Sequence, residues 1–154
     1  MVDKIFLLYI CVFKYRITLM GKLFNISEAT NIAIHSMALI SASKDELNAT
    51  QIADMLKLSK NHVAKIMHIL ARQRFVSSTR GPKGGFKMLR KPDSISLLEI
   101  YELFEGTLEQ DHCHRTDDIC PFSDCVFGDV RQRLFHEFKT YYQNRMLSDL
   151  SLKY

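Results

Sequence analysis

The clearest hydrophobic pattern in the sequence lies between residues 48 and 76. Four apolar residues recur there at the spacing of one helix face: Val63, Ile66, Met67 and Leu70. A shorter helix over 50–56 precedes them, followed by a turn of three residues, and we expect Ser59 to cap the second helix, which runs to about Arg74. Two helices joined by so short a turn are typical of a helix-turn-helix.

Weaker patterns on either side add one core helix and one hairpin. Apolar residues surround much of the segment from Ser27 to Ile40, as in a buried helix. Residues 75–79 and 86–89 read as strands, and the connection between them contains three glycines. A glycine-rich loop can also hold phosphate, but a Walker loop opens a helix and nothing helical follows Gly85. The connection therefore favours the wing of a winged helix.

The last third of the chain predicts two more helices. Ser96 and Glu99 form a capping-box pattern that starts a helix ending at Gly106. An apolar band from Val126 onward predicts a terminal helix of about 25 residues, about 37 Å long. A helix so long and apolar is expected to pack against a second subunit. The predicted fold class is mostly α with a small β-hairpin wing: a winged helix-turn-helix plus a long C-terminal dimerisation helix.

The first twenty residues fit poorly with this plan. The apolar run from Ile5 to Phe13 is too short to span a bilayer, and Lys14 and Arg16 stand where a signal peptide would have its cleavage site. We therefore expect a start site set too far upstream, and no role for Cys11. The expected domains are an N-terminal extension (1–20), a DNA-binding domain (21–92) and residues 93–154, a loop whose three cysteines suit the binding of a metal cluster followed by the dimerisation helix.

Composition indicates a globular protein of the cytoplasm, and charge indicates its partner. The hydrophobic fraction is 47% and the net charge +4. From Lys57 to Lys91 there are ten basic residues and no acidic one, whereas from Asp93 to Asp129 there are ten acidic residues and one basic one. The open side of the second helix carries polar and basic residues: Lys60, Asn61, His62, Lys65, His68 and Arg72. Such segregation predicts a polyanion-binding surface at the helix-turn-helix.

Three cysteines lie within thirteen residues, at positions 113, 120 and 125. Thiolates are soft ligands that suit iron–sulphur clusters and zinc, although a structural zinc site usually has paired Cys-x-x-Cys ligands, which are missing here. Buried thiols, or a disulfide with one cysteine left over, are the simpler alternatives. A small thiol oxidoreductase is the competing enzyme class, but the chain has neither the Cys-x-x-Cys motif nor a βαβ pattern near the cysteines.

Several of these segments together resemble one family. Ile52-Ala53, the run from Leu58 to Lys65, the run from Arg80 to Phe86, and the three cysteines are similar to the Rrf2 family of winged-helix regulators, over roughly residues 22–150. The resemblance implies a homodimeric transcription factor and no enzymatic activity. In members with three cysteines it implies a [2Fe–2S] or [4Fe–4S] cluster. The six-then-four spacing here differs from that of well-known members, so the cluster type does not carry over.

The resemblance also bears on the metal ligands. It implies Cys113, Cys120 and Cys125, with a fourth ligand that varies within the family. In some members an acidic residue near the start of the first helix reaches across from the partner subunit, and Glu28 stands there. His112 and His114 are the alternatives, and Glu28 is also the kind of first-turn acid that a helix dipole favours.

The expected function is a DNA-binding regulator, a repressor, whose operator binding is controlled by a cluster that senses redox state, nitric oxide or iron–sulphur supply. The alternative is a winged-helix regulator with a zinc site or a thiol switch. Two-fold symmetry predicts a palindromic duplex operator with half-sites about 34 Å apart. No membrane partner is expected. The residues expected to meet DNA are Thr50, Ser59, Lys60, Asn61, His62, Lys65, Arg72, Arg80, Gly81 and Lys83.

Overall fold

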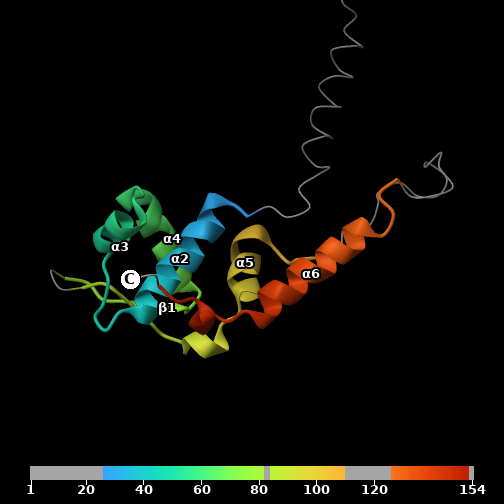
Figure 1. Cartoon of the computed structure of the whole chain (residues 1–154). Helices are drawn as coiled ribbons and strands as arrows, with labels where there is room; N and C mark the ends of the chain where they lie inside the picture. Colours follow the sequence, from blue (N-terminus) through green and yellow to red (C-terminus); the bar gives the residue numbers. More distant parts are fainter. Residues whose placement is uncertain (1–25, 82–83, 110–125, 153–154) are drawn as a thin grey trace, which may run out of the picture.

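A computed structural model describes residues 26–81, 84–109 and 126–152, and Figure 1 shows how its elements are arranged. In chain order the elements are α2 (Glu28–Ala42), α3 (Ala49–Leu56), α4 (Lys60–Arg72), β1 (Val76–Ser78), β2 (Phe86–Met88), η1 (Pro92–Ser94), α5 (Leu97–Glu105), α6 (Val130–Asn144) and η2 (Leu147–Asp149). The predicted fold class, mostly helical with a small antiparallel hairpin, is confirmed. The N-terminal extension and Cys11 lie outside the described residues. In the described part of the chain no helix is long and apolar enough to cross a membrane.

Helix α2 lies at the centre of the fold. Ser27 caps it, since its side chain accepts a hydrogen bond from the Thr30 backbone amide at 3.2 Å. Eight residues of α2 are buried, on nearly all sides of the helix. Helices α3, α4 and α5, strand β2 and the turn η2 all contact it. The prediction of a core helix with apolar residues around much of its surface is confirmed.

Helices α3 and α4 form the predicted helix-turn-helix. Asn48 and Gln51 make a complete capping box at the start of α3. Lys57, at φ 55°, takes the left-handed conformation that ends α3 and turns the chain toward α4. The four residues of the predicted stripe on α4 are all buried. Helix α4 ends at Arg72, two residues earlier than predicted, because the left-handed backbone of Arg74 (φ 62°) directs the chain into the wing.

The wing is a two-stranded antiparallel hairpin whose second strand is also held by a third segment. Strands β1 and β2 pair with Val76 opposite Met88 and Ser78 opposite Phe86. Leu47 exchanges two backbone hydrogen bonds with Phe86, at 3.2 and 2.9 Å, and so joins the hairpin to the segment before α3. A Cβ at Gly84 would lie 2.1 Å from the Thr79 carbonyl oxygen, so only glycine fits there.

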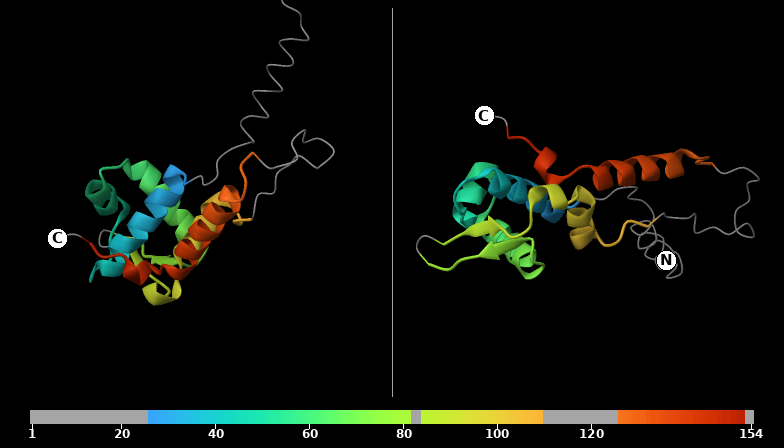
Figure 2. Two further views of the ribbon diagram at one scale, coloured as in Figure 1. Left: turned by 45° about the vertical axis from the view of Figure 1, so that its right-hand side comes forward. Right: turned by 90° about the horizontal axis from the view of Figure 1, so that it is seen from below.

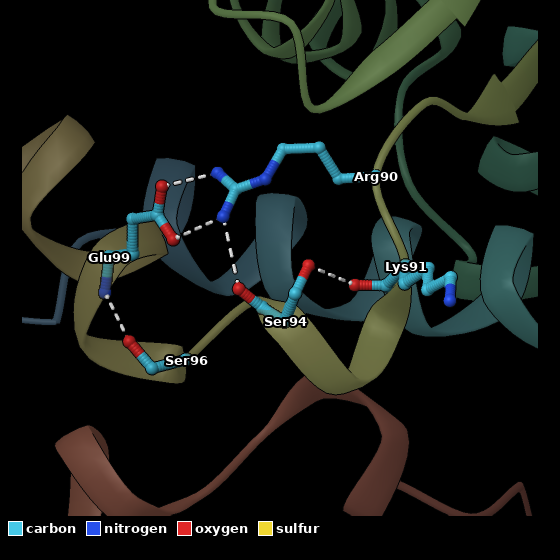
Figure 3. Close-up of polar contacts among 5 residues, drawn as sticks. All are labelled: Arg90, Lys91, Ser94, Ser96 and Glu99. Carbon is cyan, nitrogen blue, oxygen red and sulfur yellow. Dashed lines mark hydrogen bonds and ion pairs between the residues drawn. The ribbon is translucent and has the colours of Figure 1, made fainter.

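The start of α5 holds the base of the wing, just after β2, through Arg90 (Figure 3). The Ser96 hydroxyl accepts a hydrogen bond from the Glu99 amide at 3.2 Å, as predicted. The Glu99 carboxylate does not complete the capping box; it forms a two-pronged ion pair with the Arg90 guanidinium. The hydrogen bond from the Arg90 guanidinium to the Glu99 carboxylate raises the pKa of Arg90. Arg90 also donates to the Ser94 carbonyl at 3.0 Å and lies 5.3 Å over the Phe75 ring.

The prediction of a terminal helix of about 25 residues from Val126 is wrong. Helix α6 has 15 residues, Val130–Asn144, and the chain then becomes extended. Backbone hydrogen bonds from Leu97 to the Arg145 carbonyl and from Leu147 to the Ile95 carbonyl, both 2.9 Å, attach this extended segment to the start of α5. Leu147 is fully buried in the core. Burying it stabilises the fold more than further turns of a half-exposed helix would.

Helix α6 packs on α5 through aromatic rings. Phe138 and Tyr142 stack with their ring centroids 4.3 Å apart, and Tyr101 of α5 meets both rings edge-on. Burial raises the pKa values of Tyr101 and Tyr142. One hydrophobic core contains residues from both 21–92 and 93–154, and the division of the chain between these two segments stays a prediction.

Leu147→Ala tests the corrected C-terminal path. Truncating a fully buried leucine should lower the free energy of unfolding by about 2–5 kcal/mol, measured by urea denaturation. Leu89→Ala removes the same atoms from a side chain that is 55% exposed and should cost well under about 1 kcal/mol. Equal costs at the two positions would contradict the burial of Leu147.

Candidate nucleic-acid interface

The predicted DNA-reading residues of α4 share one open face of that helix. Asn61, Lys65 and Arg72 are exposed on the side of α4 opposite the buried stripe, and exposed Lys60 and partly buried His62 lie on either side of them in the first turn. We call these five residues the reading face. Figure 1 shows α3 and α4 at one end of the molecule and α6 extending from the other, and the views of Figure 2 agree. The reading face and the predicted dimerisation helix are therefore well separated.

The start of α4 is left open, contrary to the expected cap at Ser59. Ser59 is the residue before the helix, but its side chain makes no capping hydrogen bond; only its carbonyl accepts from His62 and Val63, at 3.1 and 3.0 Å. The first backbone N–H groups of a helix have no partner within the helix and attract anions. With the exposed ammonium of Lys60 beside them, they make a position suited to phosphate.

The wing contributes a second basic position. Arg80 and Gly81 are exposed at its described tip, where Gly81 has a φ of 122° that glycine tolerates. Gly84 donates to the Gly81 carbonyl at 3.0 Å and Thr79 to the Gly85 carbonyl at 2.9 Å, so the turn is held by its own backbone. Lys83 lies outside the described residues.

Thr50 and several further basic residues complete the surface around these positions. Thr50 is exposed in the first turn of α3, next to the capping Asn48. The exposed basic residues of the helix-turn-helix and wing, besides those already named, are Lys57, Arg74, Lys87 and Lys91. Their exposure agrees with the polyanion-binding surface that the charge distribution predicts.

Acidic residues from other parts of the chain approach this surface, although the stretch from Lys57 to Lys91 contains none. Oε1 of Glu28 lies 3.7 Å from Nδ1 of His62. Glu46 accepts a hydrogen bond from the Thr79 hydroxyl at 3.4 Å. Arg90, one of the ten basic residues of the acid-free stretch, is neutralised by Glu99. A stretch without acids in the sequence is therefore not free of acids in space, and Arg90 does not belong to the candidate interface.

The predicted metal ligands are placed only in part. Cys113, Cys120, Cys125, His112 and His114 lie outside the described residues. Over residues 26–81, 84–109 and 126–152, the structure brings no three His, Cys, Asp or Glu side chains together as a metal site. The donor set itself, three thiolates within thirteen residues, has the chemistry of an iron–sulphur site.

Glu28 occupies a well-anchored position at the start of α2. Its side chain is 66% exposed. Glu105, the last residue of α5, accepts hydrogen bonds from the Ser27 amide at 2.8 Å and from the Thr30 hydroxyl. Residues 106–109, which follow α5, therefore begin close to the helix end that carries Glu28. The sequence did not reveal this junction, although a threonine within a core helix is the kind of residue that needs a buried partner.

Comparisons with known proteins place the chain among bacterial regulators. The sequence model of the Rrf2 family, described as an iron-dependent transcriptional regulator, matches residues 26–152. An HTH-type transcriptional regulator of Aquifex aeolicus is 27% identical over 128 residues, covering 80% of this chain and 89% of that protein. BadM of Rhodopseudomonas palustris is 35% identical over 83 residues, 53% of each chain. NsrR of Shouchella clausii is 30% identical over 71 residues, 46% of this chain and 48% of its own length.

Solved structures share the fold. CymR of B. subtilis, titled the global cysteine regulator, has a TM-score of 0.67 at 20% identity, with 82% of this chain and 95% of that chain covered. IscR of T. potens has a TM-score of 0.63 at 19% identity, with 82% and 85% covered. At these identities the similarity establishes the winged-helix fold.

Ser59→Ala and Asn48→Ala test the difference between the two helix starts. Asn48→Ala removes a complete capping box and should lower the free energy of unfolding by about 1 kcal/mol. Ser59→Ala removes no capping hydrogen bond and should change the free energy of unfolding by less than about 0.5 kcal/mol. The same variant should weaken DNA binding in a gel-shift titration. A loss of stability from Ser59→Ala as large as that from Asn48→Ala would mean that Ser59 caps α4 after all.

Proposed function

The chain belongs to the Rrf2 family of transcriptional regulators, and on that premise we propose that it is a homodimeric repressor that binds a palindromic operator under the control of an iron–sulphur cluster. The single observation that carries the DNA-binding part is the reading face: an exposed polar and basic surface on α4 whose helix start has no side-chain cap. A regulator of this kind acts where the bacterial chromosome lies, in the cytoplasm.

DNA recognition is divided between α4 and the wing. Helix α4 enters the major groove, with Asn61 and Lys65 nearest the base edges and His62 beside them. Lys60 and Arg72, at the two ends of the reading face, bind phosphates, together with the open N-terminus of α4. Arg80 and Lys83 of the wing reach the flanking minor groove.

The dimer is expected to form through α6. Three apolar side chains of that helix are 40–58% exposed: Val130, Leu134 and Tyr141. They lie next to Phe138 and Tyr142, which pack against α5, and extend the apolar surface of α6 that α5 leaves exposed. Contiguous exposed apolar groups mark interaction surfaces, and a second copy of α6 offers a matching one. Two-fold pairing through α6 would leave both reading faces free for two half-sites about 34 Å apart.

The cluster is assigned to Cys113, Cys120 and Cys125, with Glu28 of the partner, or else His112 or His114, as the fourth ligand. It is a [2Fe–2S] or a [4Fe–4S] cluster. The family description as iron-dependent and the soft thiolate donors support this assignment. When bound, such a cluster supplies a group that reacts with oxidants or nitric oxide or depends on iron–sulphur supply, and so provides the signal.

A zinc site or a thiol switch at the same cysteines is the second candidate. The fold similarity to CymR favours it, since the Staphylococcus aureus CymR has been solved in an oxidized form. Colour separates the two candidates, because a cluster gives visible absorbance whereas zinc and thiols do not.

The DNA-binding proposal predicts two different responses to substitution. Arg80→Ala should weaken binding to all sequences alike in fluorescence-anisotropy titrations. It should also flatten the slope of log K against log salt by about 0.9 for each phosphate that the variant no longer neutralises. Asn61→Ala should leave that slope unchanged and reduce the preference for operator over random duplex by about 1–3 kcal/mol. Equal reductions in affinity for both duplexes from both variants would mean that α4 is not the recognition helix.

The cluster proposal predicts which cysteines matter. Replacing Cys113, Cys120 or Cys125 by Ala should abolish the visible absorbance of protein purified without oxygen and lower its iron and acid-labile sulphide to near zero, with helical content retained. Cys11→Ala is the matched control and should change neither. Colourless wild-type protein with bound zinc would favour the second candidate, and a requirement for Cys11 would contradict the assignment.

A further inference from the structure

Two residues of the described chain have a left-handed backbone without being glycine. Across residues 26–81, 84–109 and 126–152, five residues have a positive φ: three are glycines, and the other two are Lys57 (φ 55°) and Arg74 (φ 62°). In this conformation Cβ lies too close to the following carbonyl oxygen, which costs free energy that glycine does not incur. Any residue with a side chain is therefore strained at these two positions, and both positions carry a basic residue.

The fold requires the left-handed conformation at both positions, because α3 and α4 end in the same hydrogen-bonded motif. In each, the amide of the left-handed residue donates to the carbonyl three residues before it, and the next amide donates to the carbonyl five residues before itself. These two bonds measure 3.3 and 2.9 Å after α3, and 3.1 and 3.0 Å after α4. They form the Schellman motif, in which the left-handed residue is usually glycine and sometimes asparagine.

Neither basic side chain has a partner that would explain its presence. The side chains of Lys57 and Arg74 are exposed, and neither makes a hydrogen bond or an ion pair with another residue of the described part of the chain. The dipole of the preceding helix favours a cation at its C-terminal end. Helix-dipole stabilisation is therefore the alternative that an experiment has to separate from a role in DNA binding.

The two residues lie at opposite ends of the helix that carries the reading face. Lys57 is the third residue before α4, and Arg74 is the second residue after it. Helix α4 has 13 residues, which span about 20 Å at 1.5 Å per residue. The major groove of DNA is about 12 Å wide, so a helix of this length that enters it at an angle extends to the phosphate backbones on both sides. Basic side chains at the two ends of α4 therefore come close to phosphates of opposite strands.

We propose that Lys57 and Arg74 bind the phosphate backbones on the two sides of the major groove, one at each end of α4, and that their strained backbone is retained for these contacts. The inference rests on the proposed function, since it requires α4 to be the recognition helix. It adds two residues to those expected to meet DNA. The Schellman position suits this role, because its hydrogen bonds fix the backbone from which the basic side chain extends.

Paired substitutions at each position separate the charge from the backbone strain. Lys57→Gln and Arg74→Gln remove the charge and keep the strain, whereas Lys57→Gly and Arg74→Gly remove both. At each position the two variants should flatten the slope of log K against log salt equally, by about 0.9 for each phosphate that is no longer neutralised. The slope is measured by fluorescence anisotropy on a duplex selected from a random-sequence pool. Thermal unfolding should place each glycine variant about 2–4 °C above the glutamine variant, because only glycine relieves the strain.

Arg133→Gln is the matched control for net charge. Arg133 belongs to α6, which extends from the opposite end of the molecule from α4, and its side chain is 68% exposed. The variant should leave the salt slope unchanged, because salt screens exposed charges separated by more than about 8 Å. The double variant Lys57→Gln/Arg74→Gln should flatten the slope by the sum of the two single changes, because contacts with separate phosphates are independent.

Three results would overturn the inference. The first is a wild-type slope for Lys57→Gln or Arg74→Gln, which with a lowered melting temperature would indicate a helix-dipole role. The second is an equal flattening from Arg133→Gln. The third is a double variant with no flatter a slope than either single variant. If Arg80→Ala flattens the slope while the variants at 57 and 74 do not, only this inference fails; if none of them does, the proposed DNA-binding function fails first.

Discussion

Burial of α2 is the constraint on which the rest of the structure depends. This one helix contacts α3, α4, α5, β2 and η2, and eight of its fifteen residues are buried. Helix α4 is therefore positioned by the same apolar surface that positions α5 and the C-terminal turn η2. Packed interiors deform little, and α2 contacts both α5 and α4. A displacement of α5 would therefore also displace α2 and α4. The end that carries α3 and α4 and the end that carries α6 therefore form one packed unit.

Polar contacts hold together those ends of helices and strands that apolar packing does not hold. Glu105 joins the last turn of α5 to the first turn of α2. Arg90 and Glu99 join the end of the wing to the start of α5, over the ring of Phe75. Both contacts are made by carboxylates of α5. The acidic segment that follows the basic stretch therefore serves in part to hold neighbouring elements together. Of the basic residues, Arg90 is neutralised by Glu99, and the exposed lysines and arginines of α4 and the wing provide the positive charge.

The sequence predicted the elements whose signals are local. The stripe from Val63 to Leu70, the glycine turn and the cap at Ser96 depend on neighbours in sequence, and the structure has them. Helix α6 ends at Asn144 because the chain becomes extended to bury Leu147 against the start of α5. The helical pattern in the sequence does not show where such a long-range contact ends a helix. The Glu28–His62 contact joins residues 34 positions apart, and only packing of α2 on α4 creates it. The missing side-chain cap at Ser59 likewise does not follow from residue type, because serine is a preferred N-cap residue.

The first turn of α4, together with the wing, is the surface that we expect to meet DNA. Hydrogen exchange measured by mass spectrometry, with and without a duplex selected from a random-sequence pool, tests this most directly. The amides at the start of α4 are not covered by a Ser59 cap, so they should exchange fast in the free protein and slow down on binding, together with residues 79–81. Exchange in α6 should stay unchanged. Slowing confined to α5 and α6, with none at the start of α4, would contradict the account.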